Sequence, residues 1–253
     1  MKLNHKNYFT LANKNISNSK MGDYLRDPYY FYEKHIECSL ERSVTPAMIV
    51  GSGVDCILTG SWEDFDKRFQ VATPKEELRE GVQRITKGQY ETITKIALSV
   101  EKLDAYKAIK VFDSQKILHV EFPDFGMWKG ICGIPDWINI DGNKCTIVDL
   151  KTSKTIDPRK FHYHSLEFGY YRQQAFYNIM VALMYPKVTE FENRLIVVEN
   201  NGLHRSAVFT MDQEYLEDSY EEINETIQSI VETKTYKPQN LTWKDAFVLP
   251  FGE

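Results

Sequence analysis

The most informative part of the chain reads GIPD at residues 133–136 and IVDLKT at residues 147–152. Both stretches belong to segments with the β-branched content of strands, residues 129–140 and residues 144–151. The Asp-Gly-Asn between them, at residues 141–143, is typical of a tight turn. Together these segments predict a β-hairpin.

The register of this hairpin brings two acidic side chains together. With Gly142 and Asn143 as the central turn residues, Asp136 lies directly opposite Asp149, at a separation of about 5 Å. Lys151 shares a face with Asp149, because side chains alternate along a strand. Two carboxylates at this spacing suit Mg²⁺ or Mn²⁺, and a lysine beside the ion can orient a water molecule and neutralise a phosphate. Without a cation the carboxylates would repel each other.

A simpler interpretation of the same residues is a solvated hairpin end with an incidental ion pair between Asp149 and Lys151. A carboxylate-x-lysine triplet carries little information by itself, since the chain has a second one, ETK at residues 232–234. The triplet at residues 149–151 differs because it ends an apolar strand whose hairpin partner carries another aspartate. This context favours a functional site.

The composition is typical of a folded protein and limits the classes of function. Of 253 residues, 42% are hydrophobic and 26% charged, which argues against disorder. The net charge of −5 is mildly repulsive to nucleic acid, so any such contact needs a local basic patch or a bound metal. We expect a cytoplasmic protein without a membrane partner, because residues 1–18 lack the apolar core of a signal peptide and no apolar run is long enough to span a bilayer. The four cysteines form no CxxC pair, which argues against a zinc knuckle and a disulfide scaffold.

We expect one continuous α/β (α+β) domain over residues 1–253, with a central mixed sheet flanked by helices, since no linker or repeat interrupts the chain. Its parts are a loose arm (1–16), a mainly helical part (17–110), a sheet core with flanking helices (111–232) and a tail (233–253). Helices are predicted from Ser17 to residue 35 with an interruption at Pro28, and over 47–58, within 74–110, over 165–184 and over 212–232. Strands are predicted over 115–122, 129–140, 144–151, 194–199 and 206–210.

Three further blocks accompany the hairpin motif. They are SNSKMGDYLRDPYYFY at residues 17–32, GSGVD at residues 51–55 and RQQAFY at residues 172–177. In this order the four blocks resemble the PD-(D/E)XK nuclease superfamily, in particular its RecB-like and phage exonuclease (exodeoxyribonuclease VIII-like) branch. Each block is degenerate by itself, and together they span roughly residues 17–180, most of the chain. The resemblance implies a restriction-endonuclease-like core.

The resemblance also implies roles for individual residues. Asp136 and Asp149 would be metal ligands together with the Leu150 carbonyl, and Lys151 would be the catalytic lysine. Asp55 stands where the branch usually has a histidine. It would remain a metal ligand of a harder type, although a buried helix cap or a partner for an arginine explains an aspartate there as well.

The block at residues 172–177 resembles the QxxxY helix of the branch. Gln173 and Tyr177 lie one helical turn apart and would contact DNA or support the catalytic lysine, although polar residues at the edge of a core are the alternative. Arg172, Ser19 and Lys20 are further residues expected to bind DNA or support the site.

The implied activity is that of a Mg²⁺- or Mn²⁺-dependent DNA exonuclease that processes duplex ends for phage recombination or repair. A homo-oligomer and a single-strand annealing protein are the implied partners besides DNA. No iron–sulfur cluster is expected, because Asp27 stands where cluster-bearing relatives have a cysteine and no C-terminal cysteine triplet exists. The alternatives are a structure-selective or restriction-type endonuclease and a non-catalytic DNA-binding module that retains the fold.

Several other residues are weaker candidates. Glu121 could approach the same metal, His162 and His164 could touch phosphate, and the aromatic run at residues 29–32 could stack on bases, although core packing or solvation explains each of them. A basic rim around the acidic site could include Lys20, Arg26, Arg159, Lys160 and Arg172.

Overall fold

The computed structural model describes residues 5–40 and 44–233, and at its centre lies a mixed sheet with the strand order β3-β6-β7-β8-β9. These strands are β3 (Asp113–Ser114), β6 (Trp137–Asp141), β7 (Lys144–Ser153), β8 (Glu190–Glu199) and β9 (Ser206–Thr210). β7 runs parallel to β8, and the other neighbours are antiparallel. Two small sheets pair β1 (Phe69–Val71) with β2 (Gln83–Ile85) and β4 (Leu118–Glu121) with β5 (Gly130–Gly133).

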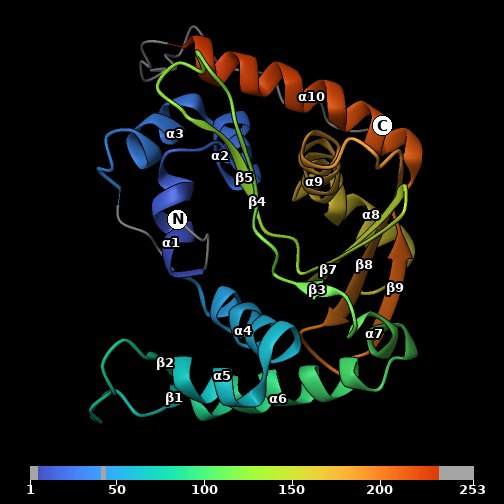
Figure 1. Cartoon of the computed structure of the whole chain (residues 1–253). Helices are drawn as coiled ribbons and strands as arrows, with labels where there is room; N and C mark the ends of the chain where they lie inside the picture. The colour runs from blue at the N-terminus through green and yellow to red at the C-terminus, as the bar shows by residue number, and fades with distance from the viewer. Residues whose placement is uncertain (1–4, 41–43, 234–253) are drawn as a thin grey trace, which may run out of the picture.

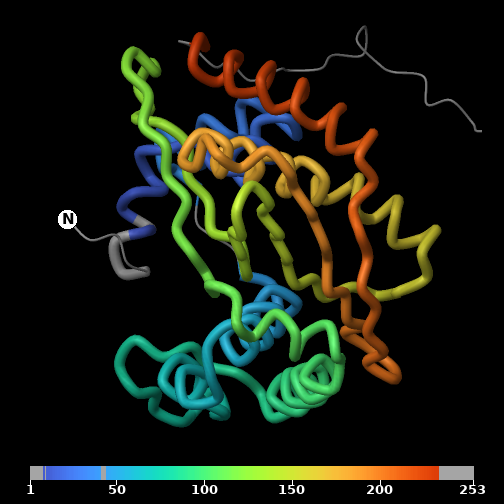
Figure 2. The backbone as a smooth tube through the Cα atoms, turned by 45° about the vertical axis from the view of Figure 1, so that its right-hand side comes forward, coloured from blue at the N-terminus to red at the C-terminus, as the bar shows by residue number. Residues whose placement is uncertain are grey.

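Helices cover both faces of the central sheet, which confirms the predicted mixed sheet flanked by helices (Figure 1). One layer holds α1 (His5–Asn13), α2 (Asn18–Arg26), α3 (Pro28–His35), α8 (Pro158–Glu167), α9 (Tyr170–Met184) and α10 (Gln213–Glu232). The other holds α4 (Pro46–Asp55), the π-helical turn η1 (Cys56–Gly60), α5 (Trp62–Arg68), α6 (Lys87–Glu101) and α7 (Asp104–Ile109). Figure 2 shows α10 along the top of the molecule and the α5–α6 layer at the bottom. Within the described ranges, no helix is both long and apolar enough to cross a membrane.

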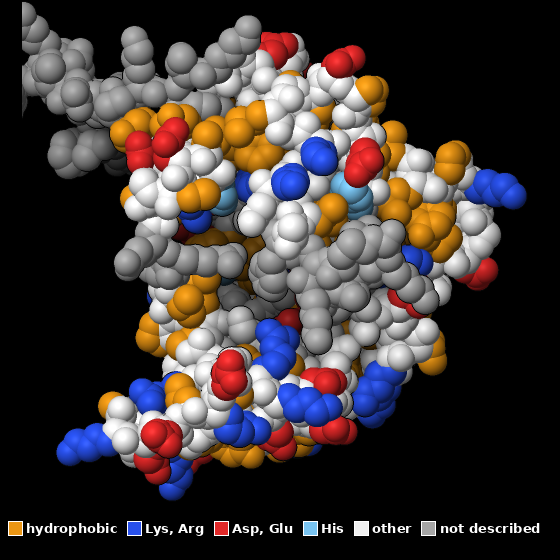
Figure 3. Space-filling model, turned by 60° about the vertical axis from the view of Figure 1, so that its left-hand side comes forward, with side chains coloured by type: hydrophobic (Ala, Val, Ile, Leu, Met, Phe, Trp, Pro, Cys, Tyr) orange, Lys and Arg blue, Asp and Glu red, His pale blue; other side chains and the backbone are white. Residues whose placement is uncertain are grey.

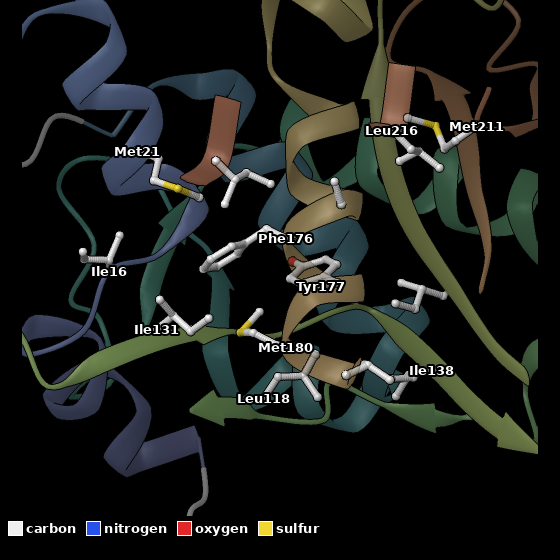
Figure 4. Close-up of a cluster of buried hydrophobic side chains, with 14 of the residues drawn as sticks. Ile16, Met21, Leu118, Ile131, Ile138, Phe176, Tyr177, Met180, Met211 and Leu216 are labelled. Atoms are coloured by element: carbon white, nitrogen blue, oxygen red, sulfur yellow. The ribbon is translucent and has the colours of Figure 1, made fainter. Parts of the chain in front are cut away.

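The sheet separates two apolar cores, because its side chains alternate between the two helical layers. On the α9 side, Phe176 and Met180 pack with Leu118, Ile131 and Ile138 (Figure 4). The opposite core is built by helices α4 to α7 on the other face of the sheet.

The alternation along β7 determines where the acidic side chains point. Ile147 belongs to the core on the α9 side, whereas Val148 belongs to the core on the other side. Asp149 and Lys151 follow Ile147 at intervals of two residues, so they share its face and point toward α9. The strand pattern therefore places both charged residues on the face of the sheet that α9 covers.

The hairpin has the predicted register. Trp137 pairs with Val148 and Asp141 pairs with Lys144, so Gly142 and its neighbour are the central turn residues. Gly142 has a φ of 60°, which suits the first central position of a type II′ turn. The strand predicted over residues 129–140 is wrong in one respect, because β5 and β6 are separate strands of different sheets.

The break between β5 and β6 falls at residues 134–136, where Pro135 has no backbone N–H for a sheet ladder. Asp136 therefore stands one position before the first paired residue of β6 instead of within the strand. Its carbonyl still accepts a hydrogen bond from the Gln115 N–H at 2.9 Å.

The prediction of a loose arm over residues 1–16 is wrong for its described part. Residues 5–13 form α1, and Ile16 is fully buried. The Ile16 N–H donates to the Gly130 carbonyl at 2.9 Å, and the Lys129 N–H donates to the Lys14 carbonyl at 2.9 Å. These bonds hold the segment along β5, which no local sequence signal indicates.

Two predicted helices have different limits in the structure. The helical pattern from residue 74 begins only at α6, because Thr86 and Gln89 form a capping box there, while residues 83–85 form β2. The helix predicted over residues 165–184 is divided into α8 and α9 by Gly169, whose φ of 63° is left-handed. The helix after Ser17, the interruption at Pro28, the last strand pair and the last helix agree with the prediction. Of the predicted tail at 233–253, residues 234–253 lie outside the described residues.

Candidate active site

The two acidic residues of the hairpin motif meet where β7 passes the break between β5 and β6. Asp149 lies on β7, which is paired on both sides, and is only 2% exposed. Asp136 is half-buried, and its Oδ2 accepts a hydrogen bond from the Leu150 N–H at 2.7 Å. This bond fixes Asp136 against the strand that carries Asp149.

These residues line a pocket of about 310 Å³ between the sheet, α4 and α9. Its wall is formed by Gly51, Ser52, Asp55, Ile134, Asp136, Asp149, Leu150, Lys151, Thr152, Tyr170 and Gln173. The pocket thus contains six of the residues that the sequence assigned to the site. The pocket opens to solvent, and Asp55 and Asp136 are partly exposed in it.

The amine of Lys151 is held from three directions. It forms an ion pair with Asp149 Oδ2 and donates a hydrogen bond to Gln173 Oε1 at 2.8 Å. It also lies 4.9 Å from the centroid of the Tyr170 ring, a cation–π arrangement. Burial lowers the pKa of Lys151, but the carboxylates of Asp149 and Asp136 outweigh it and raise the pKa overall. The amine is therefore charged at neutral pH.

Gln173 is itself positioned by α9. Its Nε2 donates to Tyr177 Oη at 2.9 Å, and Tyr177 Oη donates to the Ile134 carbonyl at 2.9 Å. Both side chains lie on one face of the helix because they are four residues apart. Of the two roles left open for this pair, the chain of bonds to Lys151 fits support of the lysine, and Tyr177 is buried.

Asp55 reaches the pocket from the end of α4, just before the π-helical turn η1. Gln115 Nε2 donates to both of its carboxylate oxygens, at 3.1 and 3.0 Å. Burial raises the pKa of Asp55, the Gln115 bond opposes this, and the charge of Asp149 adds to it. The structure therefore brings Asp55 to the other two aspartates, and Gln115 is a partner that the sequence did not reveal.

The electrostatics of the pocket favour a cation. Loss of water raises the pKa of Asp136 well above its usual value, and the charges of Asp149 and Asp55 raise it further. Within residues 5–40 and 44–233, no three His, Cys, Asp or Glu side chains are already gathered as a metal-binding group. Asp149 instead faces Lys151, and Asp55 faces Gln115. The donor set fits a hard divalent ion, because each carboxylate has lone pairs beyond those used by its present partner.

Two of the residues expected to bind DNA or support the site have structural partners away from the pocket. The Lys20 amine donates to the carbonyls of Ala12, Asn13 and Asn15 at 2.7, 3.2 and 2.9 Å, and burial lowers its pKa to about 8. A DNA contact by this amine is thus contradicted, because its donors are used inside the protein.

Arg172 also belongs to the interior rather than to a basic rim. Its Nε donates to Asn18 Oδ1 at 3.0 Å and its Nη1 to Glu222 Oε1 at 3.3 Å, which ties α9 to α2 and α10. Ser19 is exposed on α2, and its hydroxyl pairs with that of Ser17 at 3.0 Å. Neither residue lines the pocket.

Replacing Lys20 with methionine is expected to lower the free energy of unfolding by about 1–3 kcal/mol, because three backbone carbonyls lose their donor. DNA affinity should stay unchanged. Urea unfolding and a DNA-binding titration measure the two quantities. Lys14→Met, an exposed lysine in the same segment, is the matched control. A loss of DNA affinity at wild-type stability would reinstate Lys20 as a DNA contact.

The weaker candidates lie outside the pocket. Glu121 is an exposed residue of β4, and neither it nor His162 or His164 lines the pocket wall. In the aromatic run at residues 29–32, Phe31 is fully buried in the core on the α9 side. Arg26, Arg159 and Lys160 are exposed. On the face shown in Figure 3, Lys and Arg side chains are interspersed with Asp and Glu over the lower part of the molecule.

Sequence reasoning missed Tyr170 and Gln115. Tyr170 precedes Gln173 by three residues, so the helical period alone could have placed it on the same face. Gln115 has no comparable signal, since its position depends on the approach of β3 to β6.

Comparison with known proteins identifies a family and a shared fold. The model of a family described as a PDDEXK-like domain of unknown function (DUF3799) matches residues 17–240. Among solved structures, a candidate exonuclease from Eubacterium rectale superposes with a TM-score of 0.70 at 19% identity, over 100% of this chain and 97% of that one. The structure of SSO0001, at a TM-score of 0.33 and 15% identity over 58% of this chain and 66% of that one, is too dissimilar to indicate a shared fold. None of the curated proteins matches the chain.

Proposed function

Because the chain belongs to the PDDEXK-like DUF3799 family, we propose that it is a divalent-metal-dependent deoxyribonuclease that hydrolyses phosphodiester bonds at DNA ends. The family match confirms the resemblance of the chain to PD-(D/E)XK nucleases. The observation that carries the proposal is the convergence of Asp55, Asp136, Asp149 and Lys151 on one open pocket. A solvated hairpin end would not bury Asp149 or enclose the amine of Lys151.

In this proposal the three aspartates, with the Leu150 carbonyl, would hold Mg²⁺ or Mn²⁺. A bound divalent ion supplies Lewis-acid stabilisation of the phosphate charge and a lower pKa for water. The ammonium group of Lys151 would neutralise the scissile phosphate and orient the attacking water. Gln173 keeps that group in place, because its Oε1 accepts from the amine while Tyr177 holds its Nε2.

The mode of action follows from the implied branch of the superfamily. We propose exonuclease action in phage recombination or repair within a bacterial cytoplasm, with a homo-oligomer and a single-strand annealing protein as partners. The Eubacterium rectale protein, whose fold this chain shares, is described as a candidate exonuclease, which supports this mode.

The test is incubation of the purified protein with linear and covalently closed circular DNA, each with Mg²⁺ or with EDTA. We expect loss of the linear DNA only, and only with Mg²⁺. Nicking of the closed circle would assign an endonuclease instead. Binding of DNA without metal-dependent loss of either substrate would assign a non-catalytic module, and the proposal would be wrong.

A further inference from the structure

A connected group of aromatic rings leads from the pocket to the protein surface at the corner between α8 and α9. Tyr170 forms part of the pocket wall, and the amine of Lys151 lies 4.9 Å from its ring centroid. Tyr170 Oη lies 3.4 Å from His164 Nε2. The ring of Phe168 lies 4.4 Å from that of His164 and 6.1 Å from that of Tyr170. We call Phe168, His164 and Tyr170 the corner aromatics.

Phe168 is the outermost of the corner aromatics and is 54% exposed. More than half of its side chain is open to solvent, and its ring neighbours the rings of His164 and Tyr170. A buried core does not account for it, since the ring lies at the end of α8 beside the left-handed Gly169. The exposed Phe168 ring adjoins the pocket wall, because its neighbour Tyr170 is one of the residues that line the pocket.

The charged residues that act on His164 are of opposite sign, Lys154 and Glu167. Lys154 follows β7 and is close enough to His164 to lower the pKa of the imidazole, which burial lowers more. Arg159 and Lys160 are exposed in the first turn of α8. Glu167 opposes them from the end of the helix. A polyanion that also carries flat apolar groups would meet Lys154 beside the corner aromatics and Arg159 and Lys160 at the other end of α8.

Resting on the proposed function, we propose that Phe168 is a stacking platform for an unpaired nucleobase of a single-stranded or frayed DNA end. Inside a duplex neighbouring bases cover both faces of each base and a blunt end leaves free only the outer face of its last pair, whereas an unpaired base can turn either face to the ring. Stacking on aromatic side chains is tolerant of sequence and is the usual means by which proteins hold single strands. The base on Phe168 would place the next phosphate of the strand toward Lys151.

The test uses a single-stranded oligonucleotide with 2-aminopurine at its end, whose fluorescence falls on stacking, and a blunt duplex as second probe. Ca²⁺ replaces Mg²⁺ to slow hydrolysis. Phe168→Ala and Phe168→Leu are expected to weaken single-strand binding by roughly 5- to 150-fold and to abolish the quenching. Phe168→Trp should retain both. Tyr163→Ala, which removes a 72% exposed ring from the same helix, is the matched control and should behave as the wild type.

Equal single-strand affinity of Phe168→Ala and Tyr163→Ala would overturn the platform, as would an equal loss of affinity for both probes. Phe168→Leu retains an apolar side chain, so it keeps the test valid if the alanine variant folds poorly. Hydrolysis of DNA by the wild type together with normal binding by the Phe168 variants would overturn this inference alone. If the wild type neither binds nor hydrolyses DNA, the proposed function fails as well.

Discussion

Replacing Lys151 with methionine is expected to abolish DNA hydrolysis and to destabilise the fold by about 3–5 kcal/mol, the cost of leaving a buried charge without its partner. The Lys151 side chain is 14% exposed and that of Asp149 only 2%. Methionine retains much of the apolar stem of lysine but leaves Asp149 facing an uncharged group. Urea unfolding followed by circular dichroism measures the stability, and loss of linear DNA in Mg²⁺ measures the activity.

The double variant Asp149→Asn/Lys151→Met separates the two effects. It removes both charges, so it should recover most of the lost stability while remaining inactive. An inactive but stable double variant would show that inactivity does not result from unfolding. DNA loss at the wild-type rate in Lys151→Met would contradict the catalytic role. Equal stability of the single variant, the double variant and the wild type would contradict the account of Asp149 as a buried charge that needs its partner.

The part of the site that lies on the hairpin could be predicted from the sequence because local chemistry fixes it. A two-residue turn at Gly142 determines every pair along β6 and β7, and the alternation of a strand determines which faces its residues share. The positions of Asp149 and Lys151 follow from these two rules. These two rules do not predict the hydrogen bond from the Leu150 N–H to Asp136. Asp136 follows Pro135 and lies just outside the ladder of β6 and β7, so strand pairing does not determine its position.

The rest depends on contacts between distant segments, which a single sequence does not encode locally. Gln115 contacts Asp55 across 60 positions of the chain, and the arm at residues 5–16 is held by β5. Lys20 is an example of the opposite error, in which the sequence suggested a DNA contact for a side chain that the fold uses internally. A lysine near the expected site suggests a phosphate contact, yet its long side chain instead reaches three carbonyls at the end of α1.

Replacing Asp136 with asparagine is expected to reduce DNA hydrolysis by at least about 10³-fold and to stabilise the protein in EDTA. Loss of water and the charges of Asp149 and Asp55 all raise the pKa of Asp136, so its ionised form destabilises the fold at neutral pH. Asparagine removes that charge, and its side-chain oxygen can still accept from the Leu150 N–H. Thermal melting measures the effect, where a rise of ~2–4 °C corresponds to about 1 kcal/mol for a chain of this size.

The same melting experiment tests the divalent ion without any reading of activity. Mg²⁺ should raise the melting temperature of the wild type, because an ion bound only by the folded state stabilises it by mass action. It should have a much smaller effect on Asp136→Asn, which has lost one charged ligand. Asp113→Asn, which alters an exposed carboxylate paired with Lys116, is the matched control and should respond to Mg²⁺ as the wild type does. Two results together would contradict the metal site: a melting temperature of Asp136→Asn below that of the wild type in EDTA, and no change in the wild-type melting temperature on addition of Mg²⁺. They would mean that the ionised aspartates stabilise the fold and bind no divalent ion.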